Sequence, residues 1–239
     1  MATNYKPLNI KDHKDLKLKP VTTFSHIKDQ HMAPVALHEF VKCATSLPVI
    51  FVKPSEDQPY QAVAMLGLKP GENLVIHEGT WNAVYMPSCI QIYPFQIART
   101  SKENDQHTII VDENADNIST TEGDALFDDE GKGTEFMDRC QQQIEKHFQE
   151  ITESRAAIEY LAELDLIKSQ DLTITVPNIE DKIVISGISI IDEEKMNALS
   201  TEKFEELRKR GLLPALYAQL ASMHQMHRLT QMMEKTQAA

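Results

Sequence analysis

The stretch that decides the fold is 48–66, which runs PVIFVKPSEDQPYQAVAML. Segments rich in β-formers stand at its two ends, at 48–53 and 60–66, and the polar segment 55–59 separates them. Such segments with turn-forming residues between them are typical of neighbouring antiparallel strands. A third segment of this kind follows at 73–76. We therefore predict an antiparallel meander in this part of the chain.

The sequence on either side of the meander predicts further elements. Apolar residues recur at helical spacing from His31 to Ser46, which predicts a short amphipathic helix, and 107–111 is a compact apolar strand. From Asp112 to Glu135 the chain is rich in carboxylates and turn-forming residues. We interpret 113–133 as an acidic connection.

Helical patterns dominate after this connection. Apolar residues at three- and four-residue steps over 134–168 predict one long helix or two consecutive ones. Two strands, 172–176 and 183–191, come next, and Pro214 opens a final helix that we expect to reach about Met233.

The fold class predicted is α+β, with a β-rich N-terminal half and a mainly helical C-terminal half. We treat 1–239 as one domain, in which 1–112 and 134–239 are the candidate subdivisions on either side of the acidic connection.

The charge balance excludes several classes of partner. The chain has 24 Lys and Arg against 36 Asp and Glu, a formal net charge of -12, and therefore lacks the clustered cations that nucleic acids and anionic membrane surfaces require. An N-terminus without an apolar core, and no apolar run of about 18 residues, argue against a signal peptide and a membrane span. We expect a cytoplasmic protein with no membrane insertion, and the sequence leaves a homo-oligomer open.

Metal sites have weak candidates. The segment 112–122 resembles a calcium loop, but its sixth residue is Asn117 rather than glycine and Glu122 stands eleventh rather than twelfth. His224 and His227 lie three residues apart on the final helix, a spacing that two metal ligands can use. We favour a solvated turn and ordinary histidines, and predict no metal site.

Catalytic and cofactor motifs are equally sparse. Ser88 and Cys89 follow a proline in a turn-like setting, which suits a nucleophile, but no GxSxG surrounds the serine and free cysteine is more often simply buried. The three cysteines, Cys43, Cys89 and Cys140, form no CxxC pair. No dinucleotide, P-loop or HExxH motif occurs. We therefore assign no catalytic residue and no cofactor.

An aromatic segment is the strongest candidate for recognition. Four of the chain's aromatic residues stand close together between 81 and 95, interrupted by two prolines, and a fifth lies on the final helix; they are Trp81, Tyr85, Tyr93, Phe95 and Tyr217. Trp and Tyr combine a large ring with a polar group that suits a partly wet pocket. Plain core packing is the alternative for all five.

The order of several motifs resembles the SapC family of bacterial proteins. The motifs are VAMLGL at 63–68, GENL at 71–74, WNAVYMP at 81–87, YPF at 93–95, GDALFD at 123–128 and YAQLASM at 217–223. The likeness extends from about residue 45 to 230, with Gln219 standing where a histidine is usual. The family name implies an association with surface-layer proteins. The resemblance also implies a gene that lies near outer-membrane receptor genes, as is often the case for family members.

Resemblance and composition together give the functional expectation. We expect a non-enzymatic accessory protein that binds a peptide, protein or small ligand in a bacterial surface-layer or nutrient-uptake system, with the aromatic segment in its recognition surface. Two alternatives stay open. One is an enzyme acting on a peptide or amino acid, which needs convergent titratable groups. The other is a nutrient-sensing regulator, which needs a closed apolar pocket with a few polar anchors.

Overall fold

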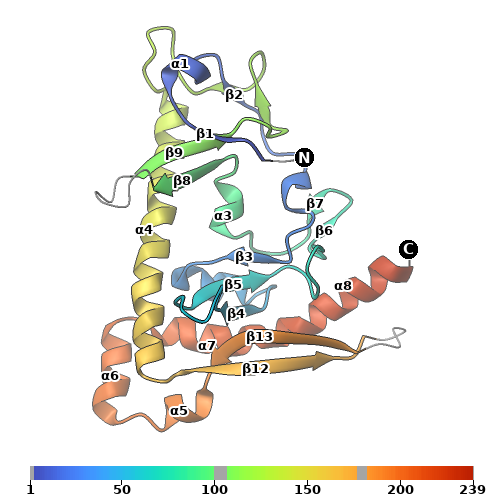
Figure 1. The fold of residues 1–239 in the computed structure, drawn as a ribbon, viewed down its shortest axis with the longest axis vertical. Helices are drawn as coiled ribbons and strands as arrows, with labels where there is room; N and C mark the ends of the chain where they lie inside the picture. Colours follow the sequence, from blue (N-terminus) through green and yellow to red (C-terminus); the bar gives the residue numbers. More distant parts are fainter. Residues whose placement is uncertain (1–2, 100–106, 177–181, 239) are drawn as a thin grey trace. The chain divides into compact units, whose positions relative to one another are not determined.

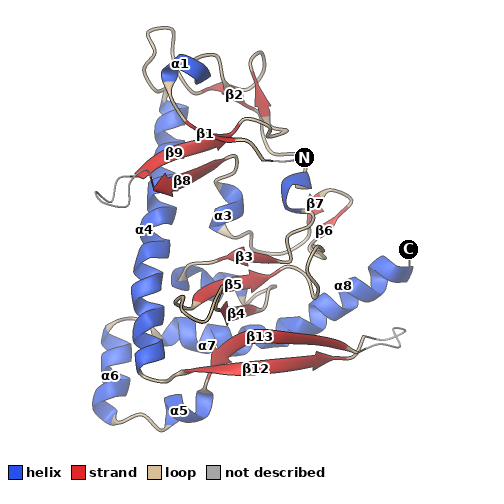
Figure 2. Ribbon diagram, in the orientation of Figure 1, coloured by secondary structure: helices blue, strands red, loops and turns tan. Residues whose placement is uncertain are grey.

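The computed structural model describes residues 3–99, 107–176 and 182–238. Its architecture is mixed α and β, with many antiparallel strands in the N-terminal half and helices mostly in the C-terminal half, as predicted (Figures 1 and 2). The chain divides into two compact units, each assembled from two separate stretches of sequence. Unit 1 comprises 1–26 and 88–149, and unit 2 comprises 27–87 and 150–239.

Unit 1 contains two small antiparallel sheets. The first has the order β1-β9-β8, and the second places β2 between β10 and β11. The strands are β1 (Tyr5–Pro7), β2 (Lys17–Leu18), β8 (Phe95–Arg99), β9 (His107–Asp112), β10 (Ile118–Ser119) and β11 (Asp124–Ala125). Because β2 pairs with strands about a hundred residues further along the chain, the acidic segment folds against the N-terminal arm.

One hydrophobic cluster holds unit 1 together. The N-terminal arm, both sheets and the long helix α4 (Glu135–Glu163) all contribute to it. Its buried members are Leu16, Leu18, Phe95, Val111, Leu126, Met137 and Ile144. Two short helices, α1 (Ile10–His13) and α3 (Ser88–Gln91), also belong to this unit. The 3-10 turn η1 (Ser25–Ile27) begins in unit 1 and ends at the first residue of unit 2.

Unit 2 is built around a five-stranded antiparallel sheet of order β12-β13-β4-β5-β3. Its strands are β12 (Ile167–Ile174), β13 (Ile183–Ile191), β4 (Val49–Val52), β5 (Gln61–Met65) and β3 (Met32–Pro34). The predicted pairing of 48–53 with 60–66 is confirmed by β4 and β5. The segment 73–76 instead leads into a separate hairpin of β6 (Ile76–His77) and β7 (Thr80–Trp81).

The helix predicted from His31 to Ser46 is wrong over its first part. Residues 32–34 form β3 because they pair with β5, and this pairing overrides the helical spacing of the apolar residues. Helical structure begins only with the 3-10 turn η2 (Leu37–Glu39) and continues in α2 (Phe40–Cys43).

The C-terminal region of unit 2 is helical. It contains α5 (Glu193–Asn197), α6 (Thr201–Lys209), α7 (Leu213–Ser222) and α8 (Met226–Ala238). The single final helix that we predicted is broken by the 3-10 turn η3 (Met223–Gln225). Gly211 has a φ of 71°, a left-handed conformation that suits the turn between α6 and α7. Leu229 and Met233 are buried, so α8 packs against the unit well beyond α7.

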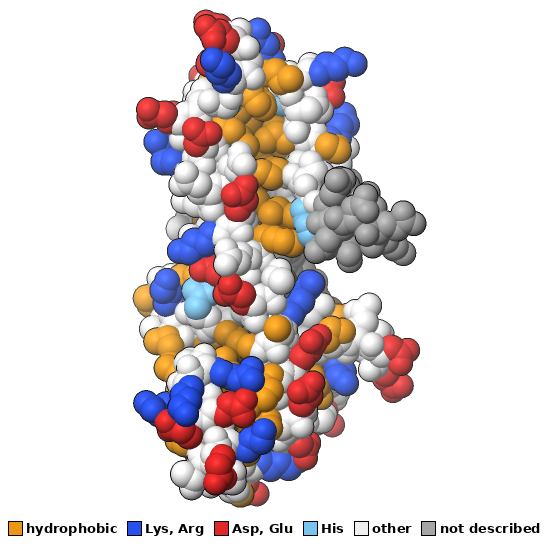
Figure 3. All heavy atoms as spheres, turned by 90° about the vertical axis from the view of Figure 1, so that its left-hand side faces the viewer, with side chains coloured by type: hydrophobic (Ala, Val, Ile, Leu, Met, Phe, Trp, Pro, Cys, Tyr) orange, Lys and Arg blue, Asp and Glu red, His pale blue; other side chains and the backbone are white. Residues whose placement is uncertain are grey.

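Among the described residues, no helix has both the length and the apolar character needed to cross a bilayer. On the face that carries α4, acidic and basic side chains are interspersed rather than separated (Figure 3). The excess of carboxylates therefore forms no surface of a single sign there.

A side chain of α7 completes the central sheet of unit 2. The ladder between β13 and β4 pairs Ile188 with Val52 and Ser189 with Phe51 and extends no further. Beyond it, the Gln219 amide takes the place of strand pairing: it accepts a hydrogen bond from the Ile191 N–H at 3.0 Å and donates one to the Val49 carbonyl at 2.9 Å. Gln219 is fully buried, so its role here is structural.

Replacing Gln219 with leucine removes the amide but keeps most of the volume. The Val49 carbonyl and the Ile191 N–H then lose their partner in a buried place, which costs about 1–3 kcal/mol per group. We expect urea unfolding to show a correspondingly lower free energy of unfolding. The exposed Gln142→Leu variant on α4 is the control and should stay within about 0.5 kcal/mol of the parent protein. An equally small change for Gln219→Leu would show that the amide is dispensable.

Candidate functional site

Unit 1 contains a pocket of about 490 Å³. It lies where the chain leaves β2 and meets the acidic segment around β10 and β11. Most of the residues that line it carry polar side chains. They are Lys19, Pro20, Val21, Thr22, Thr23, His26, Tyr93, Asp116, Asn117, Glu122 and Gly123.

Backbone pairing shapes one wall of this pocket. Leu18 of β2 pairs with Ile118 on one side and Asp124 on the other. The chain reaches this second pairing through Gly123, whose φ is 105°. A Cβ at Gly123 would lie only 2.3 Å from the Leu18 carbonyl oxygen, so only glycine fits this close approach.

Two stacked rings form another part of the lining. The imidazole of His26 and the phenol of Tyr93 lie parallel, with ring centroids 3.6 Å apart and an interplanar angle of 6°. The Tyr93 hydroxyl donates a hydrogen bond to Asp112 Oδ2 at 3.4 Å. Burial and the negative charge of Asp112 raise the pKa of Tyr93, so the phenol stays protonated and remains a donor.

The buried Asp112 carboxylate connects this ring pair to the sheet. Its Oδ1 accepts hydrogen bonds from the backbone N–H of Asn4 at 2.7 Å and of Asn114 at 3.2 Å. Tyr5 pairs with Asp112 across the β1–β9 ladder. The carboxylate thus joins the N-terminal strand, the end of β9 and the Tyr93 ring.

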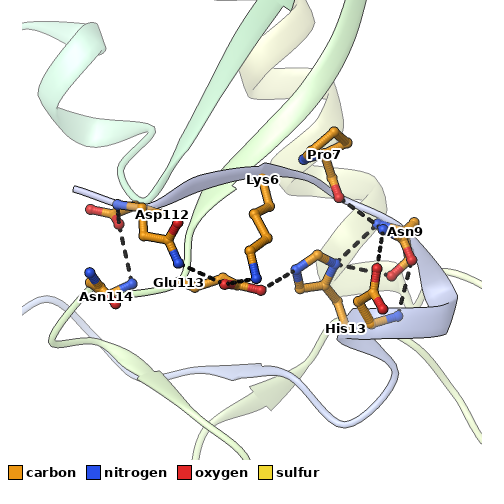
Figure 4. A network of polar contacts seen from close by, with 9 residues as sticks. Lys6, Pro7, Asn9, His13, Asp112, Glu113 and Asn114 are labelled. Atoms are coloured by element: carbon orange, nitrogen blue, oxygen red, sulfur yellow. Dashed lines mark hydrogen bonds and ion pairs between the residues drawn. The ribbon is translucent and has the colours of Figure 1, made fainter.

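Figure 4 shows that the neighbouring polar contacts hold the N-terminal arm in the same way. Glu113 forms an ion pair with Lys6 at 2.7 Å and contacts His13 Nε2 at 3.3 Å. On its other side, His13 Nδ1 accepts the Asn9 N–H at 3.2 Å. The hydrogen bond and charge of Lys6 lower the pKa of Glu113, so this carboxylate stays ionised and keeps the arm in place.

Two polar atoms of the lining residues lack a hydrogen-bond partner among the described residues. Asn117 is 7% exposed, and its Oδ1 is buried without a donor. His26 Nε2 is likewise buried without a partner. Burial lowers the pKa of His26, an effect that Asp116 and Asp112 oppose. Buried polar groups in proteins are nearly always hydrogen-bonded, so these two atoms are exceptions to the rule within the described residues.

The chain matches one known protein family over most of its length. A protein-family model named SapC matches residues 8–229 of the chain, a range that includes every residue lining the pocket. The chain belongs to the SapC family. Comparisons with the curated proteins and with the solved structures give no match. The resemblance that we inferred from the motifs is therefore confirmed for most of the chain.

The structure distributes the five predicted recognition residues over both units. Tyr93 lines the pocket of unit 1, and Phe95 is buried in the core of that unit. In unit 2, Trp81 Nε1 donates a hydrogen bond to the Tyr85 carbonyl at 3.2 Å. Tyr217 is exposed on α7. Their joint role as one recognition surface remains a prediction.

Tyr85 has a polar environment of its own in unit 2. Its hydroxyl donates to Glu39 Oε1 at 2.8 Å, and the second carboxylate oxygen of Glu39 accepts the Ala36 N–H at 2.8 Å. Burial and the hydrogen bond to Glu39 raise the pKa of Tyr85. Lys42 Nζ lies 5.5 Å from the centre of the Tyr85 ring. Tyr85 therefore serves as a hydrogen-bond donor to Glu39, whose carboxylate is fully buried.

Sequence reasoning missed most of the pocket. His26, Asn117 and Glu122 come from segments about a hundred residues apart that meet only because β2 pairs with β10 and β11. In the sequence, Asn117 was noted only because it stands where a calcium loop has glycine. Asn117 lies in an acidic turn directly before β10, and nothing in that local sequence indicates that its side chain is buried.

The other candidates occupy separate places. Ser88 Oγ lies 2.8 Å from His147 Nδ1 within unit 1, which gives the nucleophile hypothesis a base. Both His224 and His227 are exposed in unit 2. Within the described parts of the chain, no group of three or more His, Cys, Asp and Glu side chains is arranged to hold a metal ion.

The depressed pKa of His26 predicts a pH dependence of stability. Because its folded-state pKa lies below that of the unfolded chain, the unfolded chain binds the proton first as the pH falls. The free energy of unfolding should therefore decrease below about pH 6.5. His26→Phe keeps a ring against Tyr93 but cannot titrate, so this variant should lose less stability on acidification.

Urea unfolding of the parent and variant proteins between about pH 7.5 and pH 5 measures this difference. His224→Phe, at an exposed position, is the matched control and should keep the parent pH dependence. If His26→Phe and the parent protein lose stability in parallel, the lowered pKa of His26 does not cause the pH dependence of stability.

Proposed function

We propose that this SapC protein is a non-enzymatic accessory protein that binds a small ligand in the pocket of unit 1, within a bacterial surface-layer or nutrient-uptake system. The observation that carries the proposal is a pocket of about 490 Å³ whose lining combines the stacked rings of His26 and Tyr93 with several polar side chains. Pockets of roughly 300–1,000 Å³ are the usual size for small ligands. The cytoplasmic location remains part of this proposal and rests on the sequence alone.

The lining is held in place by contacts outside the pocket, which supports binding. Asp112 fixes Tyr93, and Tyr93 stacks on His26. Asp116 accepts a hydrogen bond from the Ser25 hydroxyl at 2.6 Å, which joins the acidic segment to the chain next to His26. A site that is already ordered loses less conformational entropy when a ligand binds.

Blocking the pocket tests this function. Thr23 is an exposed lining residue, so Thr23→Trp should fill the pocket with an indole while leaving the core intact. Thr120→Trp, at an exposed position outside the lining, is the matched control. The probes are mixtures of amino acids, dipeptides, amines, nucleosides and sugars at millimolar concentration. The readout is the His26 imidazole signal in carbon–proton NMR spectra, assigned from its loss in His26→Phe.

We expect at least one probe to shift the His26 signal saturably in the parent and in Thr120→Trp, but not in Thr23→Trp. The proposal fails if no probe class moves this signal, or if Thr23→Trp responds like the parent protein.

The enzyme alternative is favoured by one contact, the 2.8 Å hydrogen bond between Ser88 Oγ and His147 Nδ1. A serine becomes a nucleophile when a base takes its proton and further groups stabilise the developing negative charge. Such an enzyme would attack a peptide or another acyl compound through Ser88.

A fluorophosphonate probe separates the two functions because it reacts covalently with activated serines. Our proposal predicts that Ser88 stays unlabelled, because a protein that only binds its ligand needs no covalent step through this serine. Peptide mass spectrometry after incubation reads this out. Labelling of Ser88 that disappears in His147→Ala would favour the enzyme over the binding protein.

A further inference from the structure

We propose that the pocket of unit 1 binds a short peptide in an extended conformation, which pairs as an added strand with the backbone of residues 20–23. We call these four lining residues the open segment. The inference rests on the proposed function, since it assumes that the pocket binds a ligand. It names the class of that ligand from the backbone groups that the open segment presents.

The open segment continues β2 beyond the end of its ladders. The strand itself is flanked on both sides, by β10 and β11. After it, the Lys19 N–H still donates to the Asn117 carbonyl at 2.8 Å. Pro20 comes next and carries no N–H, which removes a donor that the ladder would need to continue. The chain then runs on to Phe24 without a turn or a sharp bend.

The backbone of the open segment is free to pair with a ligand. All four of its residues are exposed, and none of them forms a hydrogen bond with any other described residue. The N–H groups of Val21, Thr22 and Thr23 and the carbonyls of the segment are therefore unpaired in the free protein. An extended peptide adds to such a row of donors and acceptors as a further strand.

The sequence and the anchoring of the open segment favour this pairing. Val21, Thr22 and Thr23 are β-branched and suit an extended backbone. The segment is also held at its far end, where the Ser25 hydroxyl donates to Asp116 at 2.6 Å. A segment that is anchored on both sides loses less conformational entropy when it pairs.

The spacing of the backbone groups favours a peptide over other small molecules. In a strand, alternate residues direct their N–H and C=O groups to the same edge. A peptide repeats this spacing, whereas a small amine or an alcohol can satisfy only one or two of the groups. The stacked rings of His26 and Tyr93 in the same lining add a surface against which a peptide side chain can pack.

The probe is a pool of acetylated, amidated pentapeptides whose three central residues are varied. Main-chain pairing tolerates many sequences, so we expect the pool to shift the His26 signal saturably. A second pool with the same side chains but a fully N-methylated backbone lacks the N–H donors. It should bind at least about tenfold more weakly.

Amide hydrogen exchange measured by NMR reads out the pairing itself. In the free protein, the N–H groups of Val21, Thr22 and Thr23 should exchange quickly, because they are exposed and unpaired. With the peptide pool at saturation, exchange should slow at least about tenfold either at Thr22 alone or at Val21 and Thr23 together.

Two proline variants connect this protection to affinity. Thr22→Pro and Thr23→Pro each remove one N–H, from opposite edges, and break no hydrogen bond of the free protein. The proline at a protected position should lower the affinity for the peptide pool at least about tenfold, and the other proline, which is the matched control, should not. Thr22→Val and Thr23→Val keep the N–H and should bind like the parent protein.

Three results overturn the strand pairing while leaving the pocket as a binding site: peptides that shift the His26 signal without alternating protection, equal binding of the N-methylated pool, or a shift caused only by probes that are not peptides. Equal losses of affinity in the two proline variants contradict it as well. If no probe of any class moves the His26 signal, the binding function fails together with the peptide preference.

Discussion

The contact on which the candidate site depends is the buried carboxylate of Asp112. It accepts hydrogen bonds from the backbone of Asn4 and Asn114 and from the hydroxyl of Tyr93. A buried carboxylate is stable only when its oxygens find such donors. These hydrogen bonds connect one side chain to three parts of unit 1: the residue before the first strand, the turn after β9 and the stacked rings. Asp112 bonds to Tyr93, and Tyr93 in turn stacks on His26 in the pocket.

The other walls of the pocket depend on backbone pairing. The two-residue strand β2 has neighbours on both sides, and each comes from the acidic segment. This pairing buries Asn117, and Gly123 makes the close approach to Leu18 possible. In unit 2, a single side chain likewise joins two segments, because the Gln219 amide bridges β4 and β13 where their ladder ends. In both units, single polar side chains or glycines complete contacts between segments far apart in the sequence.

The sequence predicted the local elements better than their partners. β4 and β5 are runs of β-formers that are buried on both faces, and α4 carries apolar residues at helical spacing. Local patterns of this kind located β4, β5, β9, β13 and α4. They failed at β3, where pairing with β5 decides the conformation. They also could not place Asn117 or His26 in a pocket, because nothing near either residue in the sequence encodes the partner that lies about a hundred residues away. Tyr93 was identified from its ring and its phenol, and these are the two groups that the structure uses.

A crystal structure of the protein grown with a probe that shifts the His26 signal tests the central claim most directly. The account predicts the probe in the pocket of unit 1, in contact with the stacked rings of His26 and Tyr93. It would be contradicted by a pocket that holds only water at a saturating concentration of the probe, or by a probe bound elsewhere on the protein.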